Sequence, residues 1–567
     1  MTMTDLITSL AILFVTAGAL LLVANHFSLS PVPFYILAGL ISGAFIQEAA
    51  LIELAQWGIA FLVFVFGFRV NFGALEAVIR DSEVAAMTQL VVVGPLAFGV
   101  GLLFGFDPLN ALYFAVAATL SSTIVGSGLL EREIRDNLVH GRLASSIHLF
   151  DDLVAIAVVL VLSAEVFTAT EITSKIGYGV LFLAVALFIH RHGYSLLVRT
   201  TGGSDELTMM GSISILIAFL AAAEFAEVSI VVGAFAAGIA IRSDDTATLG
   251  VINGIESLRD FFVAIFFVTL GALVTVPTLS VLGVALTLVV LVVLINPLVI
   301  ALAFTYEGYD ARTAFLASTS LNQVSELSLV VVIQAMLLET VGIDSVVFEA
   351  VILAAAATMI FTSITRRHEE AIFERVFGRV VEGRGSRKID DRSMVSDELC
   401  DHVVIVGYGR QGRWLVDTCE RLDQEYVVIE NDPVLWGDLR EQCHNYVLGD
   451  AMASYSWERA HAEDARIVIS TVEHRGVSNV AVETTAPTDV DVIVRAQNSA
   501  QARELLERGA TFVSVPNVLA ADGLTELVES VLEGTLSEET VRAEHLDQLD
   551  DLERYGFGSK LPREELY

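Results

Sequence analysis

The stretch LFDDLVAIAVVLVL, residues 149–162, carries two adjacent aspartates, Asp151 and Asp152, inside an otherwise apolar run. It contains no lysine or arginine that could pair with them. A charged side chain at membrane depth costs several kcal/mol and persists mainly where it handles ions or protons. Because two unpaired carboxylates would otherwise only destabilise a membrane helix, the pair predicts a transport protein.

The sequence on either side of this stretch indicates a membrane domain followed by a soluble one. Mean hydropathy is +0.66 and 54% of the 567 residues are hydrophobic, which is typical of a polytopic membrane protein. Apolar runs of about 20 residues alternate with short polar breaks, and the chain becomes charged and mixed from residue 366 onward. We therefore expect a transmembrane domain at residues 1–367, a charged linker at 368–400, a soluble domain at 401–534 and an acidic tail at 535–567.

The apolar runs predict about 13 membrane-spanning helices. These are centred near Phe14, Leu37, Val63, Val93, Ala117, Ile156, Ala184, Ile217, Gly238, Phe266, Leu291, Val330 and Ala355. Arginines fall in every second connection, whereas the alternate connections contain one basic residue, Lys175. Since basic residues accumulate on the cytoplasmic side, an odd number of spans places the N-terminus outside and the soluble domain in the cytoplasm. The N-terminus has no basic segment, so we expect a true first span rather than a cleaved signal peptide.

The charge balance and the cysteines indicate which partners and which cellular environment to expect. A net charge of −35 with an isoelectric point near 4.6 describes a surface that repels nucleic acid, so no nucleic-acid partner is expected. Acid excess with very few lysines gives the hypothesis of a prokaryotic halophile, and an ordinary acidic protein is the alternative. The three cysteines, Cys400, Cys419 and Cys443, all lie in the soluble part, and their spacing indicates neither a metal site nor a disulfide framework. They fit a reducing cytoplasm.

Three polar clusters interrupt the apolar runs. They are Ser121, Ser122 and Thr123; Asp151 and Asp152; and Asn322, Gln323, Ser325 and Glu326. Transporters place the unwound backbone of two broken helices, related by an inverted repeat, at an ion site in the middle of the membrane. The first and third clusters suit those two segments. Hydroxyl, amide and carboxylate oxygens are the hard ligands that Na⁺ or K⁺ accepts in place of water.

Each cluster also has a plainer interpretation. Serines and threonines in membrane helices are often packing contacts or hydrogen-bond to their own helix. Glu326 alone is equally consistent with a structural acid. The string TIVGSG, residues 123–128, resembles a potassium-channel filter, but it ends one span and runs into a charged segment instead of following a re-entrant pore helix. Taken together, the clusters favour an ion-exchange site over packing and over a channel.

The soluble part alternates strand and helix from residue 401. Strands are expected within residues 402–409, 426–432, 445–451, 466–472, 491–497 and 511–517, which predicts a doubly wound parallel sheet. The first turn contains Gly407, Gly409 and Gly412, and Glu430 ends the second strand, where an acid would bind a ribose hydroxyl. Arg410 would add positive charge near a pyrophosphate.

These features predict a nucleotide site. Because Glu430 would repel a 2′-phosphate, NAD(H), AMP or another adenine nucleotide is expected rather than NADP. A Rossmann domain that binds nothing and only dimerises is the alternative.

From about residue 6 to residue 534, the chain resembles the Kef-type branch of the monovalent cation:proton antiporters, the cation:proton antiporter-2 family, with a C-terminal RCK (TrkA-N) domain. The motifs that carry the resemblance are Ser121-Ser122-Thr123, the FFVTLG string at residues 266–271, the Gln323 to Glu326 string, the GYGRQG phosphate loop and the GDA string that contains Asp450.

The resemblance implies a homodimeric exchanger in the plasma membrane that works by elevator-like alternating access. Asp152 would bind the cation when ionised and the proton when neutral, with Ser122 and Thr123 as further ligands. The soluble domain, with Asp450 near the adenosine, would regulate transport and share in the dimer. Apart from membrane lipids and the nucleotide, no other partner is implied.

Two departures from the family pattern leave the stoichiometry open. Kef-type members usually carry Gln-Asp where this chain has Asp151 and Asp152, and the double aspartate is similar to electrogenic sodium/proton antiporters. Those antiporters carry a lysine in the helix before the second broken segment, where this chain has Asn296.

A second RCK lobe is not expected. Na⁺ and K⁺ are not distinguished, and a nucleotide-gated potassium efflux channel and a membrane-anchored NAD-dependent oxidoreductase remain as other classes, although the soluble part shows no catalytic acid–base set.

Overall fold

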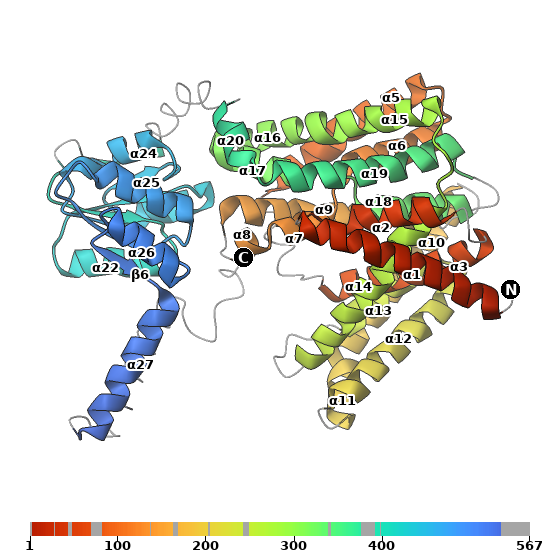
Figure 1. Ribbon diagram of the computed structural model, residues 1–567, viewed down its shortest axis with the longest axis horizontal. Helices are drawn as coiled ribbons and strands as arrows, with labels where there is room; N and C mark the ends of the chain where they lie inside the picture. The colour runs from red at the N-terminus through yellow and green to blue at the C-terminus, as the bar shows by residue number, and fades with distance from the viewer. Residues whose placement is uncertain are drawn as a thin grey trace. The chain divides into compact units, whose positions relative to one another are not determined.

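The computed structural model describes residues 3–27, 29–43, 48–69, 82–135, 138–162, 168–201, 204–241, 249–337, 342–375, 392–396, 399–534 and 542. The chain divides into two compact units. The first comprises Met1–Arg135, His140–Ala303 and Phe315–Glu369, and the second comprises Asp136–Val139, Phe304–Ala314 and Glu370–Tyr567. Helices build the first unit, and the second contains a sheet (Figure 1). Most of the charged linker and nearly all of the acidic tail lie outside the described residues.

The helices up to residue 373 include three five-residue π-helical segments. In chain order the elements are α1 (Met3–His26), α2 (Val32–Ser42), α3 (Glu48–Arg69), η2 (Gln89–Val93), α5 (Gly94–Leu103), α6 (Pro108–Thr119), α7 (Thr123–Leu129), α8 (Glu131–Arg135), α9 (Val139–Leu162), α10 (Ala169–Phe188), η3 (Ile189–Gly193), α11 (Tyr194–Thr200), α12 (Asp205–Phe225), α13 (Ile230–Ala240), α14 (Leu249–Ala272), α15 (Leu279–Val290), η5 (Leu291–Ile295), α16 (Asn296–Glu307), α17 (Ala311–Thr319), α18 (Glu326–Leu337), α19 (Ser345–Thr365) and α20 (Glu369–Phe373).

The apolar helices agree in position with the predicted spans. Within the described residues, seven helices are long and apolar enough to cross a membrane: Leu51–Phe68, Ser82–Leu103, Val139–Leu162, Thr170–Gly193, Asp205–Phe225, Leu279–Glu307 and Ser345–Thr365. Five shorter apolar helices are Ala11–His26, Val32–Ser42, Pro108–Thr119, Ile230–Ala240 and Glu326–Met336. Each predicted span centre lies in one of these helices or in α14. The number of spans and their orientation remain predictions.

Glycines allow two pairs of helices in the first unit to meet backbone against backbone. α14 packs against α2 at Gly271, where an added Cβ would lie 2.0 Å from the carbonyl oxygen of Ile36. α13 packs against α3 at Gly238, where an added Cβ would lie 2.1 Å from the carbonyl oxygen of Phe64. Small residues at helix contacts are how membrane helices pack closely without a hydrophobic driving force. The glycine that ends the FFVTLG string thus has a packing role.

Two helices are broken at the places that the polar clusters predict. The first break separates α6 from α7, with Leu120 and Ser122 in extended conformations. The second separates α17 from α18 over residues 320–325. The two unwound stretches cross as an antiparallel bridge between Ser121 and Val324, and the N–H of Ser325 donates to Leu120 O at 3.1 Å. Opposite chain directions at the crossing are what an inverted repeat produces.

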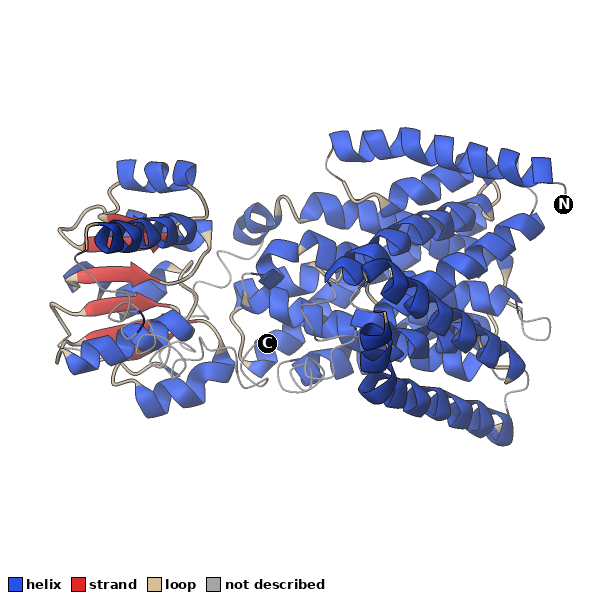
Figure 2. Ribbon diagram, turned by 90° about the horizontal axis from the view of Figure 1, so that it is seen from below, coloured by secondary structure: helices blue, strands red, loops and turns tan. Residues whose placement is uncertain are grey.

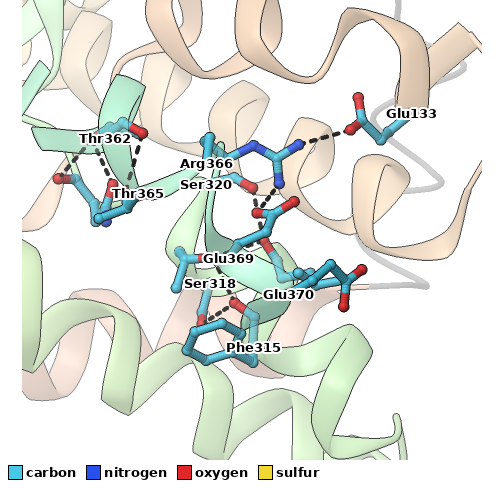
Figure 3. Close-up of polar contacts among 12 residues, drawn as sticks. Glu133, Phe315, Ser318, Ser320, Thr362, Thr365, Arg366, Glu369 and Glu370 are labelled. Carbon is cyan, nitrogen blue, oxygen red and sulfur yellow. Dashed lines mark hydrogen bonds and ion pairs between the residues drawn. The ribbon is translucent and has the colours of Figure 1, made fainter. Parts of the chain in front are cut away.

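Polar contacts tie both broken helices to the end of α19. Arg366 follows α19 and pairs with Glu133 of α8, the helix directly after α7, at 2.9 Å, and also with Glu369 (Figure 3). Nearer the crossing, the hydroxyl of Thr362 in α19 donates to the side-chain oxygen of Asn322 at 2.5 Å. The C-terminal end of α19 therefore contacts the second break directly, through Thr362, and contacts the helix that follows α7, through Arg366.

The second unit contains the predicted parallel sheet, with helices on both of its faces (Figure 2). Its strands are β1 (Val403–Val406), β2 (Tyr426–Glu430), β3 (Tyr446–Leu448), β4 (Ile467–Ser470), β5 (Asp491–Arg495) and β6 (Phe512–Ser514). Its helical elements after β1 are α22 (Arg410–Arg421), η7 (Pro433–Leu435), α23 (Trp436–Gln442), α24 (Ser454–Arg459), η8 (Ala462–Asp464), α25 (Arg475–Thr485), α26 (Ser499–Glu507) and α27 (Pro516–Leu532).

The strand order is β3-β2-β1-β4-β5-β6, the doubly wound Rossmann order, which confirms the predicted fold class for this part. The order reverses between β1 and β4, where such folds bind their ligands.

Candidate functional site

The carboxylate of Asp151 is surrounded by hydrogen-bond donors at the crossing. It accepts the backbone N–H of Ser121 at 2.8 Å and the hydroxyl of Ser121 at 2.6 Å. The amide of Gln89, from the π-helical segment η2, lies 3.2 Å from its other oxygen. The side chain is 1% exposed. An ionised carboxylate accepts several donors in this way, so Asp151 is well solvated by the protein alone.

Asp152 has a different surrounding, although it is equally buried. Its Oδ2 accepts the hydroxyl of Thr123 at 2.6 Å, and its Oδ1 has no hydrogen-bond partner among the described residues. Successive residues of a helix point about 100° apart, so the two adjacent aspartates meet different neighbours. Of the pair, Asp152 is the carboxylate with an oxygen free for a further ligand.

Glu326 brings a third carboxylate to the crossing. It is the first residue of α18 and accepts the backbone N–H of Ile124 at 2.9 Å, in the first turn of α7. The hydroxyl of Ser122 caps the same helix by accepting the N–H of Val125 at 3.3 Å. Backbone N–H groups freed by a break, together with the positive end of the helix dipole, stabilise negative charge. The break in the first helix therefore stabilises carboxylates from α9 and from α18.

Of the other residues of the third cluster, one contacts the first break and two form contacts that stabilise the second break. Gln323 donates to Ser122 O at 3.1 Å, and its side-chain oxygen has no partner among the described residues. Asn322 instead accepts from Thr362 of α19, and Ser325 accepts the N–H of Leu327 at 3.0 Å as a turn contact. The structure thus brings Gln323 and Glu326 to the aspartates through the first break, whereas Asn322 and Ser325 stabilise the second.

Asn296, which the resemblance matches to the lysine of electrogenic antiporters, begins α16 directly after η5. It is 1% exposed, and its side-chain oxygen accepts no hydrogen bond from the described residues. At this position the described chain therefore has a buried amide oxygen that accepts no hydrogen bond from the described residues, where a lysine would place a cationic side chain.

Two residues of this site are absent from the prediction, Gln89 and His148. Gln89 hydrogen-bonds Asp151 and also Thr119 O, and His148 lies 3.0 Å from the hydroxyl of Ser121. Both are polar residues in apolar runs. His148 precedes Asp151 and Asp152 by three and four residues, a spacing that places all three on one side of a helix. That spacing is the signal that could have found it.

In the second unit, the glycines of the GYGRQG loop have the geometry that a phosphate site needs. Gly407 has a φ of +94°, which favours glycine. An added Cβ on Gly412 would lie 1.9 Å from Gly407 O, so only glycine permits α22 to start so close to β1. An added Cβ on Gly409 would meet nothing within 4 Å, so open space lies above the N-terminal end of α22. A pyrophosphate fits such a helix start.

Glu430 ends β2 beside this loop, as predicted. Its carboxylate accepts the backbone N–H groups of Tyr408 at 2.6 Å, Asn431 at 2.8 Å and Asp432 at 2.9 Å. Burial raises the pKa of Glu430, and the neighbouring charge of Asp432 raises it further. These hydrogen bonds fix the orientation of the carboxylate that would bind an adenine ribose.

The remaining predicted nucleotide residue, Asp450, is engaged within the second unit. Its Oδ1 accepts the N–H of Met452 at 2.9 Å, and its Oδ2 lies 3.2 Å from the guanidinium of Arg312. Arg312 also pairs with Glu370. Arg410 starts α22 at the glycine loop, and Arg413 of the same helix pairs with Asp438.

Comparisons with known proteins agree with the resemblance seen in the motifs. A family model described as "Sodium/hydrogen exchanger, transmembrane" matches residues 10–367, and one described as "TrkA-N domain" matches residues 403–516. The chain is 25% identical over 555 residues to YbaL of Escherichia coli (strain K12), whose name proposes a cation/proton antiporter. That match covers 93% of this chain and 98% of YbaL.

A second relative is KefB of Alkalimonas amylolytica, whose name proposes a K⁺ efflux antiporter. It is 27% identical over 526 residues, which cover 86% of this chain and 75% of KefB. Among solved structures, the TrkA-N domain of inner membrane protein YbaL from Escherichia coli is 30% identical; the match covers 23% of this chain and 98% of that one, with a TM-score of 0.22.

Proposed function

Because this chain belongs to the sodium/hydrogen exchanger family of transporters and carries a TrkA-N domain, we propose that it exchanges a monovalent cation, Na⁺ or K⁺, for protons. The observation that supports this most is Asp152, a buried carboxylate with one unpartnered oxygen beside two crossed, broken helices. The names of its relatives, which propose cation/proton antiport, agree with it. Family membership favours an exchanger over an oxidoreductase.

The exchange would be a competition for Asp152. When it is ionised, its Oδ1 would bind the cation, with oxygens of Ser122 and Thr123 completing the shell. When it is neutral, it carries a proton and no longer attracts the cation. Hydrogen bonds join α9 to the first broken helix and join that helix to the second, so the carboxylates and the crossing would move together, as elevator-like alternating access requires.

The test is exchange in proteoliposomes with Na⁺, K⁺ or Li⁺ at clamped voltage, with internal pH as the readout. We expect cation-dependent proton movement in the wild type and none in Asp152→Asn, which keeps the shape of the side chain but cannot ionise. Normal exchange by this variant would refute the assignment. Current far above the turnover rate of an exchanger would favour the channel instead.

We further propose that the TrkA-N domain binds NAD(H), AMP or another adenine nucleotide and thereby regulates transport. Gly407, Gly409 and Gly412, with Arg410, would hold the phosphates, and Glu430 would bind the ribose. In calorimetry on the full chain, NAD⁺ should bind at least about tenfold tighter than NADP⁺, a difference of about 1.4 kcal/mol. Glu430→Gln should remove this preference. If no adenine nucleotide binds, the domain is a dimerisation module only.

The homodimer and the location are also proposals. In α27, the apolar side chains of Leu524, Val528 and Leu532 are 62%, 47% and 81% exposed, which suits contact with a second copy of the domain. Leu524→Asp should then lower the mass of the purified protein in light scattering, unless the membrane domain alone holds the dimer. The resemblance implies the plasma membrane, and the arginine pattern predicts an N-terminus outside and a TrkA-N domain in the cytoplasm. Cysteine labelling from each side of the membrane tests this orientation.

A further inference from the structure

His148 connects to Asp151 through a single hydroxyl group. It belongs to α9 and is 1% exposed. Its Nδ1 lies 3.0 Å from Ser121 Oγ, and the same Oγ lies 2.6 Å from Asp151 Oδ2. Its Nε2 has no hydrogen-bond partner among the described residues. The exchange chemistry derived above for Asp152 makes no use of this imidazole.

The number of protons fixes the direction of these hydrogen bonds. The hydroxyl of Ser121 has one proton, and an ionised Asp151 can only accept it. Ser121 Oγ must therefore accept from His148, so a neutral His148 carries its proton on Nδ1 and a lone pair on Nε2. Nε2 is then the atom at which a further proton would arrive.

The surroundings of Nε2 come from both broken helices. An added Cβ on Gly126 of α7 would lie 2.1 Å from Nε2, so the absence of a side chain there leaves room for the imidazole. The same Cβ would lie 2.8 Å from the amide nitrogen of Gln323, which places the second broken helix beside it. The imidazole thus lies within the crossing itself.

Asp151 has few other routes for a proton. Its described hydrogen-bond partners are the backbone and hydroxyl of Ser121 and the amide of Gln89. A backbone N–H and a side-chain amide do not release protons at any ordinary pH, whereas a hydroxyl can pass one on and receive another. A proton that reaches Asp151 through these groups must come through Ser121.

We propose that His148 and Ser121 form a proton relay to Asp151, through which the adjacent carboxylates of Asp151 and Asp152, titrating as a pair, exchange the proton that competes with the cation; the inference rests on the proposed proton exchange. A proton adds to His148 Nε2, the Nδ1 proton moves to Ser121 Oγ, and the hydroxyl proton of Ser121 moves to Asp151 Oδ2. The reverse sequence releases the proton. One proton enters and one carboxylate becomes neutral, so no other group changes its charge.

The charged groups nearest to the relay along α9 and at the crossing are the carboxylates of Asp151, Asp152 and Glu326. α9 also carries His140 and Arg142, nearer its N-terminus. The residues of α7 and of the stretch 320–325 contain no ionisable side chain. These negative charges attract a proton toward the imidazole. His148 lies nearer the N-terminal end of α9, which the arginine pattern assigns to the cytoplasm, so the relay would exchange protons with that side.

The test separates a relay from a merely structural histidine. His148→Asn keeps an N–H donor for Ser121 but has no lone pair that can be protonated, and His148→Leu has neither. For a relay, both variants should lower the proton exchange rate at saturating cation by about tenfold or more and change its pH profile. Wild-type rate and pH profile in His148→Asn, with a loss only in His148→Leu, would overturn the proposal.

Controls keep the outcome interpretable. Ser121→Ala breaks the relay at its middle while its backbone N–H still reaches Asp151, so it should show the same loss. Cation-induced thermal stabilisation should persist in Ser121→Ala and His148→Asn, which shows a folded cation site. His192→Asn, at an exposed histidine in η3, should exchange as the wild type does. If the wild type exchanges no protons for cations, the proposed function fails. If the wild type does exchange them and the relay variants behave as the wild type does, only the relay is refuted.

Discussion

At the residue scale, the two adjacent aspartates differ in their hydrogen bonds, and this predicts different effects on stability. Asp151→Asn would turn an amide group toward donors from Ser121 and Gln89, and each unmet pairing of a buried group costs about 1–3 kcal/mol. Asp152→Asn keeps an oxygen for the hydroxyl of Thr123 and can direct its NH₂ to the unpartnered side. Asp151→Asn should therefore unfold at the lower temperature in detergent. The reverse order would contradict these hydrogen-bond assignments.

The limits of prediction from sequence are also visible at this scale. Asp151, Asp152 and Glu326 could be found because a carboxylate in an apolar run is conspicuous. Gln89 and His148 are neutral polar residues of a common kind, and only the folded chain brings them to Asp151 and Ser121. Asn322 and Ser325 lie in an unwound stretch, where helical periodicity does not say which way a side chain points. Their contacts support the second break rather than the carboxylates.

At the element scale, the fold of the first unit depends on the close approach of helices at glycine. Gly271→Ala adds a methyl group whose ideal position is 2.0 Å from the backbone oxygen of Ile36, and backbone cannot turn aside as a side chain can. α14 and α2 must separate, which we expect to cost about 1–3 kcal/mol. The measurement is the thermal unfolding midpoint of the purified protein.

A matched glycine provides the control for this substitution. Gly283 lies in α15, and an added Cβ there meets nothing within 4 Å. Gly283→Ala should leave the midpoint unchanged or raise it slightly, because alanine favours helix. Equal midpoints for Gly271→Ala and Gly283→Ala would show that the α2–α14 contact adjusts without cost.

The elements themselves divide into those that sequence predicts and those that it does not. Strands and the glycine loop of the TrkA-N domain were predictable because buried parallel strands are continuous apolar runs and the loop has fixed spacing. The breaks between α6 and α7 and between α17 and α18 were predictable from polar clusters. The π-helical segments η2 and η5 contain no polar cluster; a proline follows each of them, at Pro95 and Pro297, but a proline does not specify a π-helical turn, and η2 contributes Gln89 to the site.

At the scale of the whole molecule, the proposed nucleotide regulation predicts a role for Arg312. Within the second unit it pairs with Asp450, which the motif places near the adenosine, and it lies in α17, the helix that leads into the second break. A nucleotide that bound to Asp450 would compete with its ion pair to Arg312 and so weaken a contact of α17. By linkage, the nucleotide and the cation then alter each other's affinity by the same factor.

Arg312→Gln should therefore reduce the effect of nucleotide on the half-saturating cation concentration to nearly none, while basal exchange persists. The measurement is exchange in proteoliposomes over a range of cation, with and without saturating NAD⁺. Arg475→Gln, which removes an exposed pairing with Glu504 on the same domain, should keep the wild-type nucleotide effect. An unchanged effect in Arg312→Gln would place the coupling elsewhere.

The net charge of −35 allows the halophile hypothesis to be tested through the salt dependence of stability. Like charges on a compact surface repel, and salt screens this repulsion over a Debye length of about 10 Å at 0.1 M and about 3 Å at 1 M. Trp414, Trp436 and Trp457 lie in the TrkA-N domain and Trp57 lies outside it, so tryptophan fluorescence of the full chain mainly reports that domain. Its unfolding midpoint should rise steeply between 0.1 and about 2 M KCl. Sucrose of equal osmolality raises stability without screening charge, so a rise that sucrose reproduces in full, or a midpoint that does not change with KCl, would mean an ordinary acidic protein.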